Sequence, residues 1–171
     1  MVAYKDITFT TLLSDNDPLY VEDTVYISVV IPDLDTNNFK VKVTNMYAFP
    51  GEAIFPKYNL LTNGCNPGGL AANQMTTIQN GVNNEARFAM KVFQISGFNS
   101  VKITADVVIC TDNCATDCSS QGKSADNQAD AVTVSISLDA GERYDFSSAN
   151  SLSVIWTLNT LIFSWIFVML M

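Results

Sequence analysis

Apolar and polar residues alternate along several short stretches of this chain. In "DTVYISVVI" every second residue from Val25 to Ile31 is apolar, and in "FKVKV" lysines separate Phe39, Val41 and Val43. A period of two residues is typical of a β-strand with one buried face. The turn-rich stretch "PDLDTNN" lies between the two segments. We therefore predict a β-hairpin here.

The same alternation returns in the second half of the chain. Residues 85–95, "EARFAMKVFQI", and residues 100–110, "SVKITADVVIC", are separated by a short stretch around Gly97, and we predict a second hairpin. No stretch between Ala3 and Cys118 has a convincing helical period of 3.6 residues. Several short strands with turn signals indicate an all-β fold, an antiparallel β-sandwich, over residues 1–118.

The composition changes after Cys118. Residues 119–130, "SSQGKSADNQAD", are small and polar, which predicts an exposed linker. Residues 131–138, "AVTVSISL", then alternate again and predict one more strand. Its apolar residues share one face: Val132, Val134, Ile136 and Leu138.

The last part of the chain is strongly apolar. Residues 154–171 contain no charged residue, and as a helix they would be about 27 Å long, close to the roughly 30 Å of a bilayer core. A C-terminal hydrophobic helix is therefore expected. Three roles remain open: a discarded signal for a glycosylphosphatidylinositol (GPI) anchor, a membrane span, or a core helix.

The GPI signal fits this tail best. Such a signal has small residues at the attachment point, then a polar spacer and an apolar tail. Residues 139–153 supply the first two parts, with Asp139 as the preferred attachment residue and Ser147 as the alternative. No Lys or Arg follows the apolar segment to hold it as a permanent span.

Composition excludes several functions. The net charge of −8 and the pI near 4.2 oppose binding to nucleic acid, since no basic stripe could neutralise phosphates. Histidine is absent, and no nucleophile, phosphate-binding or dinucleotide-binding motif occurs. We expect neither an enzyme nor a cofactor. The N-terminus lacks the features of a secretory signal, so we expect this sequence to begin within a longer protein.

Two features could suggest a metal. Asp33 and Asp35 begin a pattern like a calcium loop, but Asn38 and Thr44 stand where Gly and Glu are required, and we interpret the stretch as a turn. The four cysteines, three of them in "CTDNCATDC", fit two disulfides in an oxidising compartment or, less economically, a metal site. We expect no metal.

Five stretches in one order carry a family resemblance: "FKVKVTNMYAFP", "KYNLLTNGC", "ARFAMKVFQISG", "ADVVICTDNCATDC" and the apolar tail. Together they resemble the C-terminal half of a zona pellucida (ZP) domain of the uromodulin-like kind. The resemblance implies an immunoglobulin-like sandwich and two disulfides, Cys65 with Cys118 and Cys110 with Cys114. It also implies that residues 131–138 form a strand that blocks polymerisation until proteolysis, and that residues 7–13, "ITFTTLL", hold the end of an interdomain segment.

Two positions depart from the family pattern, because Met46 and Ala105 stand where relatives have a bonded pair of cysteines. We predict that Met46 and Ala105 are in contact, the flexible thioether filling the space of the lost bridge. The linker also holds one basic residue, Lys123, without the basic cluster that a furin-type protease recognises.

The resemblance also implies a function. We expect an extracellular structural or adhesion protein that contributes to a filament or matrix after processing, with other ZP-domain chains as partners. It would lie on the extracellular face of the plasma membrane through a GPI anchor or the C-terminal helix, and could be released to the matrix. The alternative is a GPI-anchored monomeric receptor that binds a ligand through the loops of the sandwich.

Overall fold

The chain forms two antiparallel β-sheets. The computed structural model describes residues 1–50, 57–95, 98, 100–111, 114, 118 and 131–141. Their elements are β1 (Val2–Tyr4), β2 (Thr24–Val30), β3 (Lys40–Pro50), β4 (Tyr58–Leu61), α1 (Leu70–Gln74), β5 (Met75–Gln79), β6 (Glu85–Lys91), β7 (Ser100–Cys110) and β8 (Val132–Asp139). The all-β prediction is confirmed, while the short helix α1 was not predicted.

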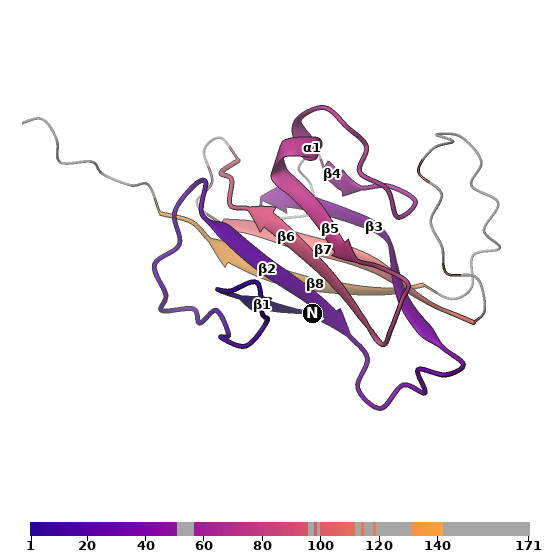
Figure 1. Cartoon of the computed structure of the whole chain (residues 1–171). Helices are drawn as coiled ribbons and strands as arrows, with labels where there is room; N and C mark the ends of the chain where they lie inside the picture. The colour runs from indigo at the N-terminus through magenta and orange to yellow at the C-terminus, as the bar shows by residue number, and fades with distance from the viewer. Residues whose placement is uncertain are drawn as a thin grey trace, which may run out of the picture.

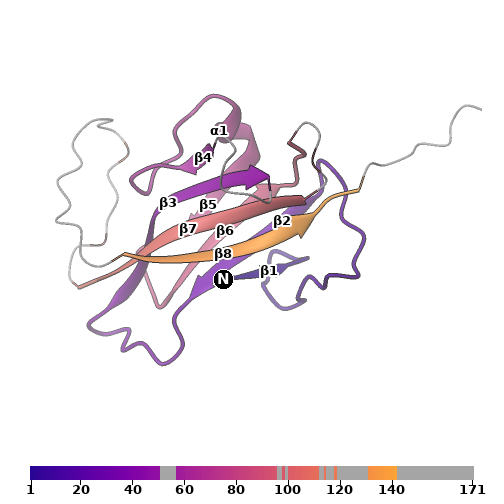
Figure 2. The same ribbon diagram turned by 180° about the vertical axis from the view of Figure 1, so that it is seen from behind.

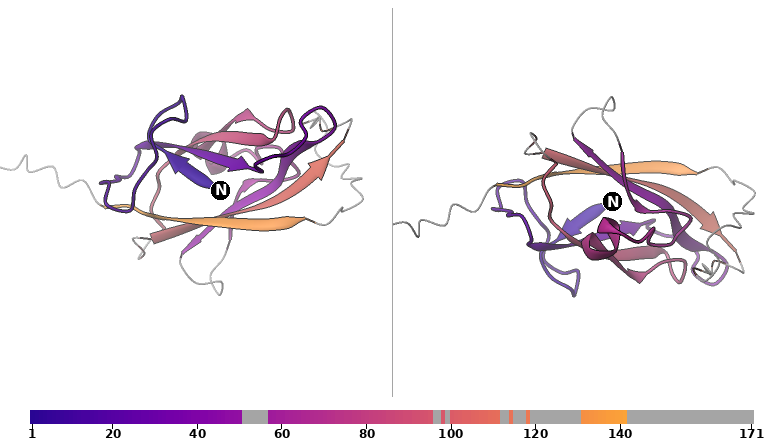
Figure 3. Two further views of the ribbon diagram at one scale, coloured as in Figure 1. Left: turned by 90° about the horizontal axis from the view of Figure 1, so that it is seen from below. Right: turned by 90° about the horizontal axis from the view of Figure 1, so that it is seen from above.

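The two sheets face each other as the layers of a sandwich (Figure 1). One sheet has the strand order β1-β2-β6-β5 and the other β4-β3-β7-β8. All their pairings are antiparallel. This is the order ABED facing C′CFG of immunoglobulin-type sandwiches. Views from below and above show the two layers edge-on, with β8 along one side (Figure 3).

Both hairpin predictions are wrong. β2 pairs with β6, and β3 pairs with β7, so each predicted hairpin is a connection between the two sheets. The alternating pattern located the strands correctly, but the strands of both sheets bury one face and therefore have the same pattern. The sequence of a strand therefore does not reveal which sheet the strand belongs to.

The core lies between the sheets and is formed by the alternating apolar residues. Ile27 of β2 pairs with Phe88 of β6, and both side chains are fully buried. Val43 of β3 and Ile103 of β7 are equally buried in the facing sheet. Burial of such side chains contributes about 1.5–3 kcal/mol each. The apolar face of each strand is therefore the main source of stability.

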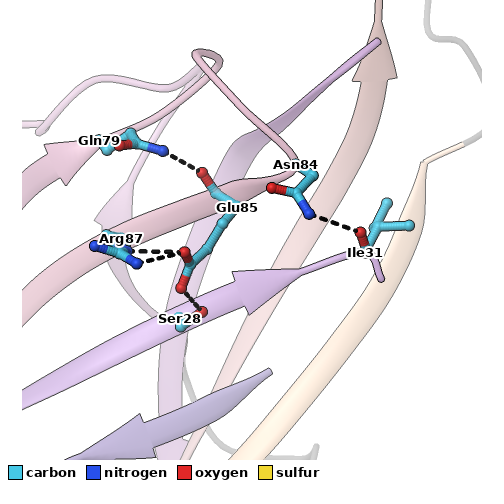
Figure 4. A network of polar contacts seen from close by, with 6 residues as sticks. All are labelled: Ser28, Ile31, Gln79, Asn84, Glu85 and Arg87. Carbon is cyan, nitrogen blue, oxygen red and sulfur yellow. Dashed lines mark hydrogen bonds and ion pairs between the residues drawn. The ribbon is translucent and has the colours of Figure 1, made fainter. Parts of the chain in front are cut away.

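A polar network ties β2, β5 and β6 together (Figure 4). The Ser28 hydroxyl donates to the Glu85 carboxylate at 2.5 Å, and Arg87 forms an ion pair with the same carboxylate at 2.7 Å. The Gln79 amide donates to the backbone carbonyl of Glu85 at 2.9 Å. Partial burial alone would raise the pKa of Glu85, but the hydrogen bonds from Arg87 and Ser28 outweigh it and the pKa is lowered.

Several sequence expectations fall outside the described residues. These are the linker at 119–130, the alternative attachment residue Ser147 and the hydrophobic helix at 154–171. Within the part of the chain that the structure describes, no helix has the length and apolar character to cross a membrane.

Candidate functional site at the β8 edge

β8 is the edge strand of the second sheet. It pairs with β7 along its whole length, from Val107 opposite Val132 to Ser100 opposite Asp139 (Figure 2). The backbone groups of β7 on this side are thus satisfied by β8. Removing β8 would leave a long row of unpaired N–H and C=O groups on β7, the kind of edge that accepts a strand from another chain.

The apolar residues of β8 point toward the core. Leu138 is buried, and Val134 and Ile136 are half-buried against the core residues. Val132, at the start of the strand, is 62% exposed. Thus three of the four predicted blocking residues pack into the sandwich and one stands largely in solvent.

A side-chain clamp holds β8 from the outer face of the sheet. The Asp106 carboxylate of β7 accepts a hydrogen bond from the Thr133 hydroxyl of β8 at 3.0 Å and one from the Asn45 amide of β3 at 3.4 Å. Three adjacent strands are joined through this one carboxylate. Asp106 was not predicted from the sequence, where its only signal is a charged residue at a polar position in an otherwise Val/Ile-rich strand.

The chain remains part of the fold after β8 ends. Ala140 is 4% exposed, and the Gly141 backbone N–H donates to the Leu19 carbonyl at 2.8 Å. Gly141 also forms a parallel bridge with Tyr20. Asp139, the preferred attachment residue from the sequence, is the last residue of β8 and lies directly before this anchored end.

The four cysteines form two disulfides. Cys65 is bonded to Cys118, with their Cα atoms 5.6 Å apart, and Cys110 to Cys114, with their Cα atoms 5.7 Å apart. This is the pairing that the family resemblance implies. No thiolate is left for a metal among these four residues.

Each disulfide has a distinct structural surrounding. Cys65 follows a tight turn in which Asn63 and Gly64 have positive φ of 51° and 78°. Cys114 is buried against Gly81 in the connection between β5 and β6: a Cβ on Gly81 would lie 2.6 Å from the Cys114 carbonyl oxygen. Cys114 therefore contacts the β5–β6 connection, near the end of the sandwich where β8 begins.

Met46 and Ala105 lie directly opposite each other on β3 and β7, as predicted. Both side chains are completely buried. Because paired residues point to the same face of a sheet, these two are neighbours in the core. An apolar pair therefore stands at the two positions where the resemblance implies a bonded pair of cysteines.

Residues 7–13 fold back beside β1. Tyr4 bridges to Leu12, and Phe9 packs edge-on against Tyr4 and Tyr26, with the Arg87 guanidinium 4.6 Å from its ring centre. The Asp6 carboxylate accepts hydrogen bonds from the Thr8 hydroxyl and the Thr11 backbone N–H, and the Thr8 bond above all lowers its pKa. The segment is thus a closed loop over the first sheet.

The remaining acidic candidates are turn residues. Asp35 accepts hydrogen bonds from the Asn38 amide at 2.7 Å and the Asn37 backbone N–H at 3.1 Å, which lowers its pKa. These bonds are typical of an Asx turn. Among the described residues, no group of three or more acidic, Cys or His residues is placed to hold a metal ion.

The family is decided by a comparison with protein-family models. The zona pellucida model, described as the ZP-C domain, matches residues 1–119. The chain belongs to the zona pellucida family. The ZP-C match thus covers the sandwich through β7 and both disulfides, and it ends before β8. The role of β8 is therefore inferred from its geometry.

Three curated relatives support the ZP-C assignment. Each is a pancreatic secretory granule membrane major glycoprotein GP2: the mouse protein is 32% identical over 130 residues, the rat protein 30% and the human protein 28%. Each alignment covers 70% of this chain and 23% of the relative. The chain therefore spans about a quarter of the length of the curated relatives it matches.

Proposed function

We propose that this chain is the C-terminal ZP half of an extracellular, non-enzymatic structural or adhesion protein. After processing, the protein contributes to a filament or matrix with other ZP-domain chains. Before processing, it is held at the extracellular face of the plasma membrane. ZP-C membership supports the extracellular class, and the two disulfides fit an oxidising compartment.

The observation that carries the proposal is the way β8 completes the second sheet. Its backbone pairs with β7, and Val134, Ile136 and Leu138 close the adjoining side of the core. A strand in this position prevents the β7 edge from pairing with another chain. Loss of β8 would expose the backbone groups of the β7 edge and the apolar side chains beside them. An incoming strand could pair with the backbone groups and cover the side chains.

The predicted linker at 119–130 joins β7 to β8, so a cut there would separate β8 from the sandwich covalently. β8 would then be held by its pairing and by the clamp through Asp106 and Thr133. Since these contacts are non-covalent, β8 could dissociate. The segment C-terminal to β8 serves in this proposal as a GPI attachment signal, with a membrane span as the alternative anchor.

The test is proteolytic cleavage of the linker at a chosen time. A site for a sequence-specific protease is placed in the linker of the full-length precursor, and particle size is followed by light scattering and electron microscopy. We expect monomers before cleavage and filaments after β8 has dissociated. Val134→Ser with Ile136→Ser should accelerate assembly, because the two changes weaken the inward contacts of β8.

The matched control is Ser135→Ala with Ser137→Ala, on the outer face of the same strand. This variant should assemble at the rate of the unaltered protein. If the cleaved protein loses β8 and stays monomeric, the filament proposal is wrong and the monomeric receptor is favoured.

A further inference from the structure

β7 extends further than the strand that covers its edge. Its pairing with β8 ends at Val107, opposite Val132, although β7 itself continues to Cys110. On the other side, β7 stays paired with β3 as far as Cys110, which lies opposite Lys40. Figure 2 shows the start of β8 beside this end of β7. We refer to residues 108–110 as the open end of β7, because none of the described residues pairs with them on the β8 side.

The open end of β7 carries an exposed apolar side chain. Ile109 is 46% exposed, although it lies opposite the fully buried Val41 of β3. The connection between β5 and β6 reaches Val41, whose N–H donates to the Asn83 carbonyl at 2.7 Å, but it leaves Ile109 uncovered. Val132 is 62% exposed, and because it lies opposite Val107 it is a diagonal neighbour of Ile109 on the same face. The two side chains form a small apolar surface at the start of β8.

The two ends of β8 are held differently. At the C-terminal end, Leu138 and Ala140 are 5% and 4% exposed, and the Gly141 N–H donates to a backbone carbonyl in the segment between β1 and β2. At the N-terminal end, the strand is held from the outer face by the clamp between Thr133 and Asp106. Local opening begins where buried contacts are fewest. β8 should therefore separate from β7 first at its N-terminal end, beside the open end of β7.

The open end of β7 is fixed in place before any strand arrives. Cys110 is bonded to Cys114, which is buried against Gly81. A strand end held in this way loses little conformational entropy when another strand pairs with it. Backbone groups beside an exposed apolar side chain fit an extended segment with alternating apolar residues, the pattern that β8 itself has. A strand from another copy of the chain is therefore the occupant that this surface fits.

We propose that the open end of β7 is the first docking site for a strand of a second copy, and that this strand displaces β8 from its N-terminal end toward Gly141. The inference rests on the proposed function and specifies how the β7 edge changes partners. The incoming strand first pairs with residues 108–110 and covers Ile109 and Val132. It then pairs with Val107 and the preceding residues of β7 as β8 leaves. A cut in the linker frees the same end of β8, so the end that opens first lies next to the docking site.

Peptide exchange on the cleaved full-length precursor tests this order of events. Two fluorescent peptides are compared: residues 131–141 alone, and the same residues preceded by Val-Thr-Val, which continues the alternation of β8 along the open end of β7. Fluorescence anisotropy follows the uptake of each peptide. We expect the longer peptide to be taken up at least about fivefold faster, at a rate that rises in proportion to its concentration. A rate that does not depend on peptide concentration would mean that β8 leaves first, and would overturn the inference.

A matched pair of variants tests the docking site itself. Ile109→Ser removes the exposed apolar side chain and should slow uptake of the longer peptide at least about fivefold. Ile78→Ser is the control, because Ile78 is 45% exposed and lies on β5, an edge strand of the other sheet. The control should take up the peptide at the rate of the unaltered protein. Equal rates for the two variants would overturn the inference.

Failure of the proposed function would give a different result. If the longer peptide docks and displaces β8 while the cleaved precursor stays monomeric, the filament proposal is wrong and the docking site stands. The remaining outcome is read from cleaved precursor that has been freed of β8 in urea and refolded. If this protein takes up neither peptide, the β7 edge accepts no strand, and both the docking site and the strand exchange of the proposed function are wrong.

Discussion

At the scale of single residues, Gly81 lies in close contact with Cys114. Its φ is +76°, and an added Cβ would lie 2.6 Å from the Cys114 carbonyl oxygen and 2.9 Å from the Cys114 Cβ. Gly68 has a similar φ of +81° with no atom within 4 Å of the same position. A comparison of substitutions at the two glycines therefore distinguishes the cost of the positive φ from the cost of the steric contact.

We predict that Gly68→Ala lowers the free energy of unfolding by about 1 kcal/mol, from the positive φ alone. Gly81→Ala should lower it by about 2–4 kcal/mol, because the Cys110–Cys114 ring must also shift. Urea unfolding of both variants under oxidising conditions measures the difference. Equal losses would mean that Cys114 does not press against Gly81.

Single residues were predictable from the sequence where the family pattern indicates that two positions are in contact. Met46 was placed beside Ala105 because two family cysteines are absent together, and the register of β3 and β7 agrees. Gly81 could not be found in this way, since a glycine in "NGVNN" reads as an ordinary turn. The close contact arises only when the disulfide loop folds onto another sheet.

At the scale of elements, the two disulfides close loops of very different length. Cys65 and Cys118 are 53 residues apart in the sequence, whereas Cys110 and Cys114 are 4 apart. In the loop-entropy model the long bridge contributes about 4 kcal/mol and the short one about 2 kcal/mol. We predict that Cys65→Ala with Cys118→Ala destabilises the protein more than Cys110→Ala with Cys114→Ala.

Denaturant unfolding of the two double variants tests this order. Each variant keeps the other disulfide, so each serves as the control for the other. A larger loss for the short ring would contradict the entropy argument. It would show that the packing of buried Cys114 contributes more than the closure of the long loop.

The elements themselves were only partly predictable. Period-2 patterns located β2, β6, β7 and β8 and the start of β3 well, because these strands bury one face. The strands β1 and β4 have 3 and 4 residues, and α1 has 5, too few to show a period. Strand partners were wrong for both predicted hairpins, since the crossing between sheets is set by three-dimensional packing.

At the scale of the whole molecule, carboxylates that accept hydrogen bonds make the fold sensitive to acid. Asp6, Asp17, Asp35 and Glu85 all have lowered pKa values. For Asp17 the main cause is the hydrogen bond from Lys5, 2.6 Å away. Such a group stabilises the folded state fully above its unfolded pKa, near 3.9 for Asp and 4.3 for Glu.

The stabilisation is lost as the pH falls through each folded pKa. We therefore predict a free energy of unfolding that changes little from pH 7 to about 5 and decreases below about pH 4.3. Glu85→Gln should make the decrease shallower, because its network with Ser28 and Arg87 no longer depends on a titrating group. Asp139→Asn, which removes an exposed carboxylate, is the matched control and should follow the curve of the unaltered protein. Urea unfolding at a series of pH values measures how steeply the free energy of unfolding decreases in each variant. Identical slopes for Glu85→Gln and the control would show that Glu85 does not contribute to the acid sensitivity. The expected acid limit lies well below neutral pH, so mild acidification alone should leave β8 paired with β7, and its release should require the cut in the linker.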